Sequence, residues 1–390
     1  MDDALAMLRK RGLVQGIINE EAWSESGIRM TSAYAGFDAT AKSLHVGHLV
    51  VFRVLHVLQD AGIPVIGLIG EGTARVGDPS FRTTERQMLD KKSVEDNALP
   101  IRKTVETLLS GKNARVVSNA EWLSDLNALD FLTETGKHFT MSRMLSFESV
   151  KARLGAGLTF LEFAYMLLQA KDFLELRERF GCDVQVGGSD QWANILCGVD
   201  LIRKTRSEVA FGITAPLLTR SDGLKMGKSE GRAVWLDPSM TSDFDFWQFW
   251  RNTPDEDVSR FLKIFTDVPE DECERFGVLR GAELNVGKIA LADSVTTLVR
   301  GEGAAKASFL AATTSEGATE GLPKATLDGE VALAKALLIA GLAQSAKAAK
   351  RFVSEGVRVN DDRVTDPARV IRAGDVLGFG KRKVLMVASS

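Results

Sequence analysis

"RMTSAYAGFDATAKSLHVGHLVVFRVLHVLQDAGIPVIGLIG", residues 29–70, decides the fold predicted for this chain. Residues 29–37 have the pattern of a β-strand. Residues 48–62 carry apolar side chains at helical spacing and predict a helix that stops at Gly62. Residues 63–70 form a short apolar run that is typical of a buried strand. This succession of strand, helix and strand predicts parallel strands joined by a crossover helix.

The same alternation continues further along the chain. Residues 114–119 and 182–188 predict strands, while residues 158–176 and 189–205 predict helices. We therefore expect an α/β domain with a Rossmann-like, doubly wound parallel sheet and helices on both faces. Sheets of this kind bind ligands at the carboxyl ends of their strands. Three glycines lie where a predicted strand ends: Gly36, Gly70 and Gly187.

The pattern changes twice after this α/β domain, to which we assign residues 1–235. Residues 236–318 are helical and rich in acidic and aromatic residues, and they predict an α-helical domain. Residues 319–330 are small, polar and glycine-containing, which is typical of a linker. Residues 331–390 predict two short helices followed by strands, and thus a small α+β domain.

The composition is that of a soluble globular protein. The chain has 390 residues, of which 45% are hydrophobic and 26% charged, and its net charge is −3, which excludes disordered and collagen-like classes. Residues 1–14 lack the apolar core of a signal peptide, and no apolar run is long enough to span a membrane. The three cysteines are scattered without metal-ligand spacing. We expect a cytoplasmic protein with reduced thiols and no membrane partner.

Positive charge gathers near the end of the chain. Residues 347–390 contain ten Lys or Arg against five Asp or Glu, a local net charge of +5. A basic tail on an acidic body indicates contact with a polyanion. An ordinary solvated surface explains the same excess equally well, so the charge alone leaves both interpretations open.

His45 and His48 flank Gly47 where the first predicted helix begins. Residues three apart share one face of a helix, and Gly47 lets a flat ligand approach the backbone. The free N–H groups of the first turn bind anions, and Thr40 adds a hydroxyl nearby. We expect these residues to bind a polyphosphate. Taken alone, the motif is also compatible with two surface histidines or a chance metal pair.

A second candidate for phosphate binding is "SDGLKMGKSEG", residues 221–231. Lys225, Lys228 and Ser229 lie there in a polar, glycine-flanked loop. Two lysines three apart can clamp a phosphate chain and stabilise charge that grows as pyrophosphate leaves. An exposed basic loop without a ligand is the alternative.

One face of the helix predicted over residues 158–176 carries polar groups. Tyr165, Gln169 and Asp172 stand at positions i, i+4 and i+7 among apolar residues. Buried polar groups need partners, so this stripe indicates a bound polar ligand. The alternative is a core tyrosine beside two solvated side chains.

Together, His45-Val46-Gly47-His48 and Lys225-Met226-Gly227-Lys228-Ser229 resemble the HIGH and KMSKS signatures of the class I aminoacyl-tRNA synthetases. Further blocks are similar, in the same order, to the tyrosyl-tRNA synthetase family: "YAGFDATAKSLHVGH", "GDPS", "FAYMLLQAKDF", "QVGGSDQWAN" and "KMGKS". The resemblance covers essentially the whole chain. It implies a tyrosine–tRNA ligase, which makes tyrosyl-adenylate and pyrophosphate from L-tyrosine and ATP and then charges tRNA(Tyr).

The resemblance also implies roles for individual residues. Tyr34 and Asp172 are expected to bind the phenol hydroxyl of the substrate. The rest of the amino-acid site is expected to comprise the ammonium ligands Asp78, Tyr165 and Gln169, the carboxylate contact Gln191 and the supporting residue Gln185. The ATP site is expected to comprise Gly36, Asp38, Thr40, His45, Gly47, His48, Gly188 and Asp190. Phosphate contacts are expected from Lys225, Lys228 and Ser229 and, on a mobile loop, from Arg82 and Arg86.

The remaining implications concern partners. The last domain resembles an S4-type ribosomal RNA-binding domain, so tRNA phosphates are expected to contact Lys347, Lys350, Arg351, Lys381, Arg382 and Lys383. The middle domain is expected to help read the anticodon, and the family is homodimeric. Mg²⁺ is expected to accompany ATP without a protein-ligated metal site. The chain departs from the family pattern at Ala39, where the family often has proline. In the middle of the lysine motif, where the family often has serine or glycine, this chain has Gly227.

Three other functions are alternatives to this one. Tryptophanyl-tRNA synthetases share the fold, but Tyr34 with Asp172 and the basic last domain argue against that substrate. A non-catalytic RNA-binding relative is expected to lose the histidines or lysines, and all four are present. A general nucleotidyltransferase leaves the tyrosine pocket and the basic domain unexplained.

Overall fold

The computed structural model describes residues 2–25, 30–80, 88–111, 113–155, 157–219, 221, 228–229, 232–281, 283–313, 322–360, 362–380 and 382–389. The chain forms two compact units. Unit 1 comprises Met1–Asp237 and Lys263–Glu270, and unit 2 comprises Pro238–Leu262 and Asp271–Ser390. The segment Lys263–Glu270, which was expected in the helical domain, therefore packs with the α/β unit.

Unit 1 is built on a six-stranded sheet in the order β1-β6-β5-β2-β3-β4. Its strands are β1 (Gly16–Ile18), β2 (Ala33–Asp38), β3 (Val65–Gly70), β4 (Ala114–Ser118), β5 (Val184–Gly188) and β6 (Phe211–Ala215). All neighbouring strands are parallel except β1, which pairs antiparallel with β6 at one edge. The strand order reverses beside β2, as in the doubly wound sheet predicted from the sequence.

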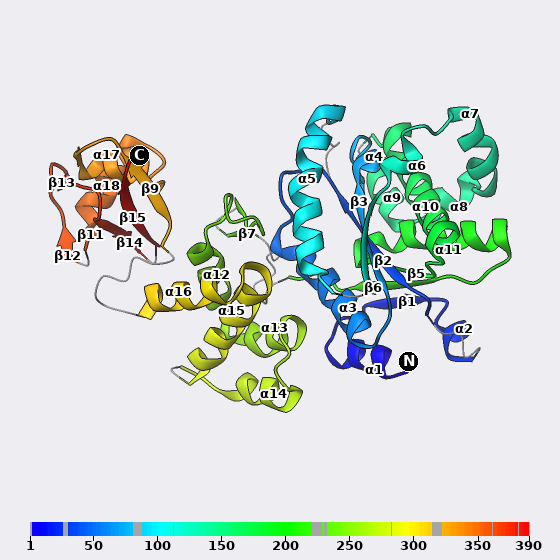
Figure 1. Ribbon diagram of the computed structural model, residues 1–390, viewed down its shortest axis with the longest axis horizontal. Helices are drawn as coiled ribbons and strands as arrows, with labels where there is room; N and C mark the ends of the chain where they lie inside the picture. Colours follow the sequence, from blue (N-terminus) through cyan, green and yellow to red (C-terminus); the bar gives the residue numbers. More distant parts are fainter. Residues whose placement is uncertain are drawn as a thin grey trace. The chain divides into compact units, whose positions relative to one another are not determined.

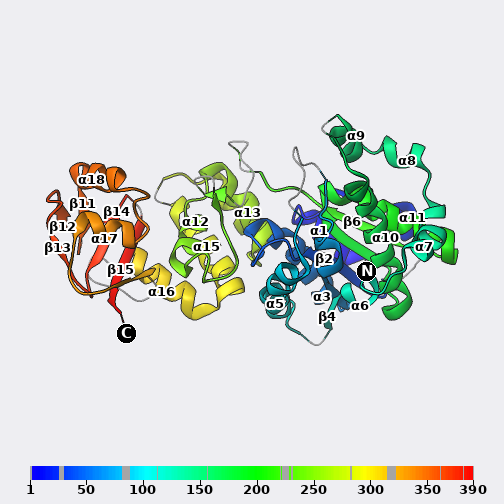
Figure 2. The same ribbon diagram turned by 90° about the horizontal axis from the view of Figure 1, so that it is seen from above.

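Helices cover both faces of this sheet (Figures 1 and 2), with α3 (Leu49–Asp60) and α5 (Lys91–Leu108) on one and α10 (Phe160–Phe180) and α11 (Trp192–Arg206) on the other. Successive β2 side chains explain this arrangement because they point to opposite faces. Phe37 stacks on Phe52 of α3 with ring centroids 4.7 Å apart, while Tyr34 packs against Phe173 of α10 at 5.2 Å.

The smaller elements of unit 1 connect these layers. They are α1 (Asp2–Lys10), α2 (Glu20–Glu25), η1 (Val46–His48), α4 (Glu71–Ala74), α6 (Ala120–Leu123), α7 (Ala128–Asp130), η2 (Phe131–Thr135), η3 (Gly136–His138), α8 (Met141–Ser146), α9 (Glu148–Leu154), η4 (Ser189–Gln191), β7 (Lys228–Ser229) and β8 (Arg232–Ala233). Helix α10 begins with a capping box between Thr159 and Glu162 and ends at Gly181, whose φ of 66° is left-handed.

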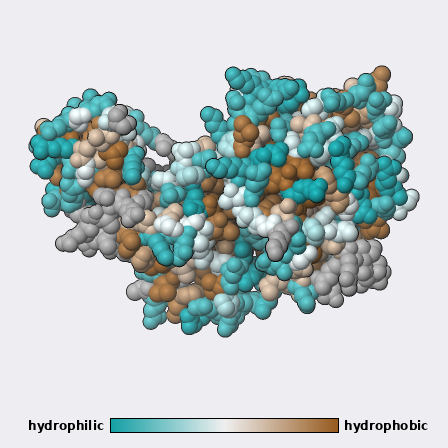
Figure 3. Space-filling view, in the orientation of Figure 1, coloured by the Kyte–Doolittle hydropathy of each residue, from teal (hydrophilic) through white to brown (hydrophobic). Residues whose placement is uncertain are grey.

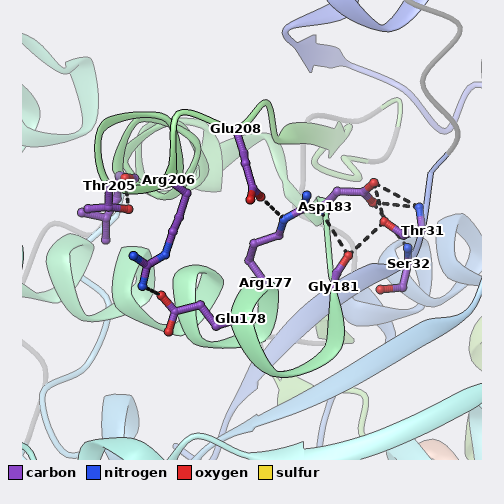
Figure 4. Close-up of polar contacts among 10 residues, drawn as sticks. Thr31, Ser32, Arg177, Glu178, Gly181, Asp183, Thr205, Arg206 and Glu208 are labelled. Carbon is purple, nitrogen blue, oxygen red and sulfur yellow. Dashed lines mark hydrogen bonds and ion pairs between the residues drawn. The ribbon is translucent and has the colours of Figure 1, made fainter.

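Polar contacts fix the amino ends of β2 and β5 against each other (Figure 4). The carboxylate of Asp183 accepts hydrogen bonds from the backbone N–H of Thr31 at 3.0 Å and from its hydroxyl at 2.6 Å. Nearby, Arg177 pairs with Glu208 at 2.7 Å and donates to the carbonyl of Gly181. These contacts set the register that places Tyr34 beside Gln185 in the sheet.

Unit 2 begins with helices whose core is aromatic. They are α12 (Asp243–Arg251), η5 (Asp255–Asp257), α13 (Val258–Phe265), α14 (Glu270–Val278), α15 (Leu284–Arg300) and α16 (Glu302–Thr313). Trp247 and Trp250 are almost fully buried, and Phe261 and Phe265 line the buried side of α13. The described residues between 238 and 313 contain no strand.

The last part of unit 2 is a small α+β fold. Its five-stranded sheet has the order β12-β11-β14-β15-β9, with β10 and β13 paired separately. The elements are β9 (Lys324–Leu327), β10 (Val331–Ala332), α17 (Leu333–Ile339), α18 (Ala346–Glu355), β11 (Val357–Val359), β12 (Asp362–Val364), β13 (Val370–Ile371), β14 (Val376–Phe379) and β15 (Arg382–Ala388).

Strand β9 corrects the linker expected at 319–330. It pairs in parallel with β15, Lys324 opposite Leu385, and Leu327 is buried in the core of this fold. The local composition of residues 319–330 predicted a linker. Strand β9 depends on pairing with β15, which lies about 60 residues later in the sequence, so local composition does not reveal it.

The visible surface is mixed in character. Hydrophilic residues cover much of the face shown in Figure 3, and hydrophobic areas interrupt them on each unit. Among the described residues, no helix has the length and apolar character that crossing a bilayer requires.

Candidate active site

The candidate site lies at the carboxyl edge of the sheet, where β2, β3 and β5 end. Gly36 is exposed within the otherwise buried β2, and a Cβ atom added there would meet no atom within 4 Å. Gly70 is the opposite case, since its added Cβ would lie 2.1 Å from Oδ1 of Asp38. One glycine therefore leaves space for a ligand, and the other lets a carboxylate approach the neighbouring strand.

Tyr34 and Asp172, which were expected to bind the phenol hydroxyl of the substrate, lie buried on the same side of the sheet. Tyr34 is 0% exposed, and its hydroxyl has no hydrogen-bond partner among the described residues. Burial raises the pKa of this phenol well above its ordinary value, and the nearby Asp172 raises it further. A neutral buried hydroxyl without a partner is costly, so a polar ligand atom at this position would stabilise it.

Two side chains that the sequence reasoning missed hold Asp172. Trp122 donates from its indole nitrogen to Oδ1 at 2.7 Å, and Asn119 donates from Nδ2 to Oδ2 at 3.0 Å. Burial raises the pKa of Asp172 to about 7, although these two hydrogen bonds lower it. Asn119 is the last residue of the predicted strand 114–119 and directly follows the observed strand β4, so its place at the carboxyl edge was a signal in the sequence.

Asn119 is itself fixed by α4 and its neighbours. Its Oδ1 accepts from the N–H of Gly72 at 2.8 Å, and its Nδ2 also donates to the hydroxyl of Thr73 at 2.9 Å. Thr73 in turn donates to Oδ1 of Asp38 at 2.8 Å. A continuous hydrogen-bond network thus connects the carboxylates of Asp172 and Asp38.

The carboxylate of Asp38 faces α10. Its Oδ2 accepts a hydrogen bond from the hydroxyl of Tyr165 at 2.8 Å. Burial and the charges of Asp38 and Asp78 raise the pKa of Tyr165 well above its ordinary value, so this phenol stays neutral. The structure therefore places Asp38, expected on the ATP side, against a residue expected to bind the amino acid.

Asp78 anchors a second polar cluster. Its Oδ2 accepts from Gln191 at 2.6 Å, and its Oδ1 accepts from the hydroxyl and the N–H of Ser80. Gln169 donates to Gln191 at 3.3 Å and accepts from Asn194 at 3.1 Å. The structure brings together the expected residues Asp78, Gln169 and Gln191, and it adds Asn194, which the sequence reasoning missed.

Gly188 and Asp190, which were expected to contact the ribose, lie at the end of β5. An added Cβ at Gly188 would lie 2.4 Å from Oδ1 of Asp190, so glycine allows that carboxylate to fold back. Gln185 is buried on β5 directly opposite Tyr34, and within the part of the chain that the structure describes its Oε1 has no hydrogen-bond partner. Two unsatisfied polar atoms, on Tyr34 and Gln185, therefore come from neighbouring strands.

His45 and His48 cap the short helix η1. Nδ1 of His45 accepts from the N–H of Gly47 at 3.0 Å, and Nδ1 of His48 lies 3.2 Å from the N–H of His45. The imidazoles therefore occupy first-turn N–H groups that were expected to be free for an anion. Because Nδ1 of His45 accepts, the neutral ring carries its proton on Nε2, where it can donate to a ligand.

His48 is a neutral group in this arrangement. Burial, with a smaller contribution from His45, lowers its pKa to about 3. The two rings lie 4.1 Å apart between centroids. A neutral pair avoids the repulsion of two imidazolium ions and still offers hydrogen-bond donors.

The turn before these histidines is held by α5. The N–H of Ala39 donates to the carbonyl of Gly70 at 3.2 Å, a bond that proline at this position could not make. Asn97 of α5 donates to the carbonyl of Ala39 at 3.1 Å. These two bonds hold the turn where the family often has proline.

The described end of the lysine loop lies beside the histidines. In the hairpin β7–β8, Lys228 pairs with Ala233. The chain then runs antiparallel to residues 44–46, with Val46 N–H to Val234 O at 3.0 Å and Leu236 N–H to Leu44 O at 2.8 Å. His45 forms a β-bridge with Trp235. Residues 234–236, which follow the lysine motif, are therefore adjacent in the fold to the histidine motif about 190 residues earlier in the sequence.

Some expected residues are not covered by this description. Lys225, Arg82, Arg86 and Lys381 lie outside the described residues, and the side chains of Lys228, Ser229 and Arg382 are not described either. Thr40 is half-buried next to the site, and its N–H donates to the carbonyl of Asp38. Within the described ranges, no group of three or more His, Cys, Asp or Glu residues could hold a metal ion.

Three of the six basic residues expected to contact RNA lie on α18. Lys347, Lys350 and Arg351 are exposed at helical spacings of three and four, so they share one face. Arg351 also pairs with Glu355 at 3.5 Å and covers the ring of Phe352. Lys383 on β15 is half-buried.

Comparisons with known proteins identify the family of this chain. Residues 28–314 match the family of class I tRNA synthetases for tryptophan and tyrosine (W and Y), and residues 333–377 match the S4 domain. The tyrosine–tRNA ligase of Cereibacter sphaeroides strain KD131 is 47% identical over 409 aligned positions, covering 100% of this chain and 98% of the relative. The ligase of Ruegeria pomeroyi is 47% identical, covering 99% and 98%.

A solved structure resembles the chain as well. It is a C-terminally truncated mitochondrial tyrosyl-tRNA synthetase of Aspergillus nidulans, with 31% identity and a TM-score of 0.70, covering 79% of this chain and 92% of that one. Family model, full-length relatives and site geometry agree, and the chain belongs to the tyrosyl branch of the class I tRNA synthetases, with an S4 domain near its end.

Proposed function

We propose that this chain is a tyrosine–tRNA ligase that forms tyrosyl-adenylate from L-tyrosine and ATP and then transfers tyrosine to the 3′ end of tRNA(Tyr). The observation that supports the proposal is the buried pair Tyr34 and Asp172, in which one hydroxyl has no partner among the described residues and one carboxylate is held by two donors. A para-hydroxyl group of a substrate suits this pair, because it can donate to the carboxylate and accept from the phenol.

Discrimination against phenylalanine follows from the same pair. Phenylalanine would leave the Tyr34 hydroxyl unpaired and Asp172 without its ligand proton, both in a buried site. Leaving a buried polar group unsatisfied costs about 1–3 kcal/mol, and more for a charged one. Tryptophan has no para-hydroxyl group and its indole is larger, so the pair also disfavours the substrate of the related branch of the family.

The other end of the amino acid would lie at the second polar cluster. Asp78 and Tyr165 would receive the ammonium group with Gln169, and Gln191 would approach the carboxylate. Asp38 lies within hydrogen-bond distance of Tyr165 and adds negative charge on the same side. This assignment supports a zwitterionic amino acid whose carboxylate points toward the end of β5.

The first chemical step requires position and charge more than covalent help. The tyrosine carboxylate attacks the α-phosphorus of ATP in line, and pyrophosphate leaves. His45 and His48 would donate hydrogen bonds to phosphate oxygens, while Lys225, Lys228 and Ser229 would stabilise the charge on the leaving group, aided by Arg82 and Arg86. Gly188 and Asp190 would contact the ribose.

Mg²⁺ would arrive with ATP as part of the substrate. Magnesium usually retains waters and binds through substrate phosphates and one or two carboxylates, so it needs no cage of protein ligands. In the second step the 2′- or 3′-hydroxyl of the terminal adenosine of tRNA would attack the adenylate carbonyl, the bond from that carbon to the phosphate oxygen would break, and AMP would leave. The S4 part would contribute basic contacts to tRNA phosphates through α18 and the cluster Lys381, Arg382 and Lys383.

Dimerisation is part of the proposal. Phe160, Met141 and Leu154, on α10, α8 and α9, are 75%, 57% and 48% exposed, and apolar surface of this kind marks protein interfaces. A second copy would cover this surface, and Phe160→Lys should shift the sedimenting species from dimer to monomer.

We also place the protein in the cytoplasm, because Cys182, Cys197 and Cys273 are buried free thiols and suit a reducing compartment.

The decisive experiment is ATP–pyrophosphate exchange measured with each proteinogenic amino acid in turn. Exchange that depends on tyrosine, and responds weakly to phenylalanine and tryptophan, is expected. Exchange driven by tryptophan, or by no amino acid, would contradict the proposal.

A further inference from the structure

The segment Lys263–Glu270 belongs to unit 1, although the residues before and after it belong to unit 2. The chain leaves unit 1 after Asp237, returns to it at Lys263–Glu270 and then continues in unit 2. Helix α13 (Val258–Phe265) begins in residues of unit 2 and ends in residues of unit 1. Whatever holds this segment therefore also holds one end of a helix that leads into the other unit.

The side chain of Arg11, which directly follows α1, binds backbone carbonyl groups of the segment 263–270. Its Nη1 donates to the carbonyl of Thr266 at 2.6 Å and to that of Lys263 at 3.2 Å. Its Nη2 lies 3.5 Å from the carbonyl of Val268. The preceding Lys10 pairs with Glu270 at 3.0 Å at the end of the segment.

Arg53 of α3 binds the same stretch. Its Nε donates to the carbonyl of Ile264 at 3.3 Å, and its Nη2 donates to the carbonyl of Thr266 at 3.3 Å. The Nη2 group also pairs with Oδ1 of Asp267 at 2.6 Å. The Arg53 side chain is 7% exposed, so its charge depends on these contacts in place of water.

The contacts suit the chemistry of a helix end. Lys263, Ile264 and Phe265 form the last turn of α13, whose carbonyl groups lack partners within the helix. Guanidinium groups satisfy such carbonyls and favour the negative end of the helix dipole. The Asp267 side chain is exposed, and the hydrogen bond and charge of Arg53 lower the pKa of its carboxyl below the ordinary value.

We propose that Arg11 and Arg53 form an arginine clasp on residues 263–268 that positions α13, and through it the helical part of unit 2, for productive tRNA charging. Arg53 lies on α3, the helix that directly follows His48, so the clasp connects α13 to the helix next to the histidine motif. Neither arginine is among the residues assigned to tyrosine or ATP, and both act as positioning residues for the step that requires tRNA. The inference rests on the proposed function.

The test compares two RNA substrates in one set of variants. Arg11→Ala, Arg53→Ala and the double variant are assayed for tyrosine-dependent pyrophosphate exchange, for charging of full-length tRNA(Tyr) and for charging of a minihelix that contains the acceptor stem alone. We expect exchange and minihelix charging to stay near wild type. We expect kcat/KM for full-length tRNA to fall about 10- to 100-fold in the double variant, as for a misplaced remote element.

Two further variants separate positioning from general damage. Arg9→Ala removes a neighbouring ion pair with Glu20 that does not touch the segment, and it should leave all three assays unchanged. Arg53→Lys keeps the charge but loses the forked donor, and it should recover part of the lost charging. Hydrogen exchange of amides 258–268 should accelerate in the double variant.

Equal losses for both RNAs, a loss in pyrophosphate exchange, or unchanged charging of full-length tRNA would each overturn the clasp. Unchanged hydrogen exchange at 258–268 would overturn it as well, and this measurement needs no substrate. A wild-type protein without tyrosine-dependent exchange would instead contradict the proposed function, so the two failures are distinguishable.

Discussion

The pocket around Asp172 and the basic face of α18 both use charged side chains, but they differ in exposure. Asp172 is 2% exposed and receives two hydrogen bonds from fixed donors. Lys347, Lys350 and Arg351 are exposed on one helix face. A buried, pre-positioned group can select one small ligand, because every wrong ligand leaves it unsatisfied. Exposed cations attract a phosphate backbone without such selection.

The largest effect is expected at the buried side of this comparison. Asp172→Ala removes the acceptor for the tyrosine hydroxyl and leaves Asn119 and Trp122 without their partner. We expect kcat/KM for tyrosine in pyrophosphate exchange to fall at least about 100-fold, the scale for losing a charged hydrogen bond in a buried site. Circular dichroism should confirm that the variant folds. Near-normal exchange would remove Asp172 from the pocket.

Lys228→Ala examines charge that acts during the reaction. The lysine should stabilise the leaving pyrophosphate, so adenylate formation is expected to slow about 100-fold while the affinity for tyrosine stays constant. Single-turnover kinetics and equilibrium binding of tyrosine separate the two effects. If affinity and rate fell together, Lys228 would contribute to ground-state binding and its role would resemble that of the pocket.

The exposed side of the comparison should respond differently. Changing Lys347, Lys350 and Arg351 together to Ala removes three cations, and charging of tRNA is expected to fall about 10-fold at low salt with a shallower salt dependence. Pyrophosphate exchange serves as the internal control and should not change. A loss that is independent of salt would mean that α18 contributes through the fold of its domain.

A smaller effect is expected from pH. The raised pKa of Asp172, about 7, means that the carboxyl is protonated below that pH and ionised above it. Only the ionised form accepts the substrate hydroxyl at full strength, so KM for tyrosine should decrease about 5-fold from about pH 6 to about pH 8. The KM for ATP measured over the same range is the control. A flat tyrosine profile would show that the ligand-bound carboxyl titrates elsewhere.

Stability should depend on pH with the opposite sign. The folded-state pKa of Asp172 lies above its ordinary value, so the folded protein binds this proton more tightly than the unfolded chain. The contribution of this group to stability is present at acidic pH and is lost as the pH rises through about 7. Ionisation of Asp172 therefore favours tyrosine binding at some cost in stability.

The sequence predicted most of the catalytic unit because its signals were local. Apolar runs predicted β2, β3, β4 and β5, and helical spacing predicted α3, α10 and α11. The same reasoning missed β1 and β6, whose pairing fixes them within the sheet more than their composition does. It also placed the linker across β9, whose partner is distant in sequence.

The site shows the same division between local and distant information. Tyr165, Gln169 and Asp172 were visible as a polar stripe on one helix. Asn119, Trp122 and Asn194 were missed, because only packing brings their side chains to the carboxylates and amides that they bind. The imidazole contacts that occupy the N–H groups of η1 were missed for a related reason, since they depend on rotamers set in the folded turn.

The sequence by itself determined the alternation of strands and helices, the two phosphate-binding motifs, the tyrosine residues and the basic last domain. These features follow from periodicity and residue chemistry over a few turns of chain. Tertiary structure alone decided that residues 44–46 pair with residues 234–236, that Asp172 is buried against Asn119 and Trp122, and that two arginines bind residues 263–268. Each of these contacts joins segments far apart in sequence. They therefore contribute to stability only when the whole sheet and its helices are packed.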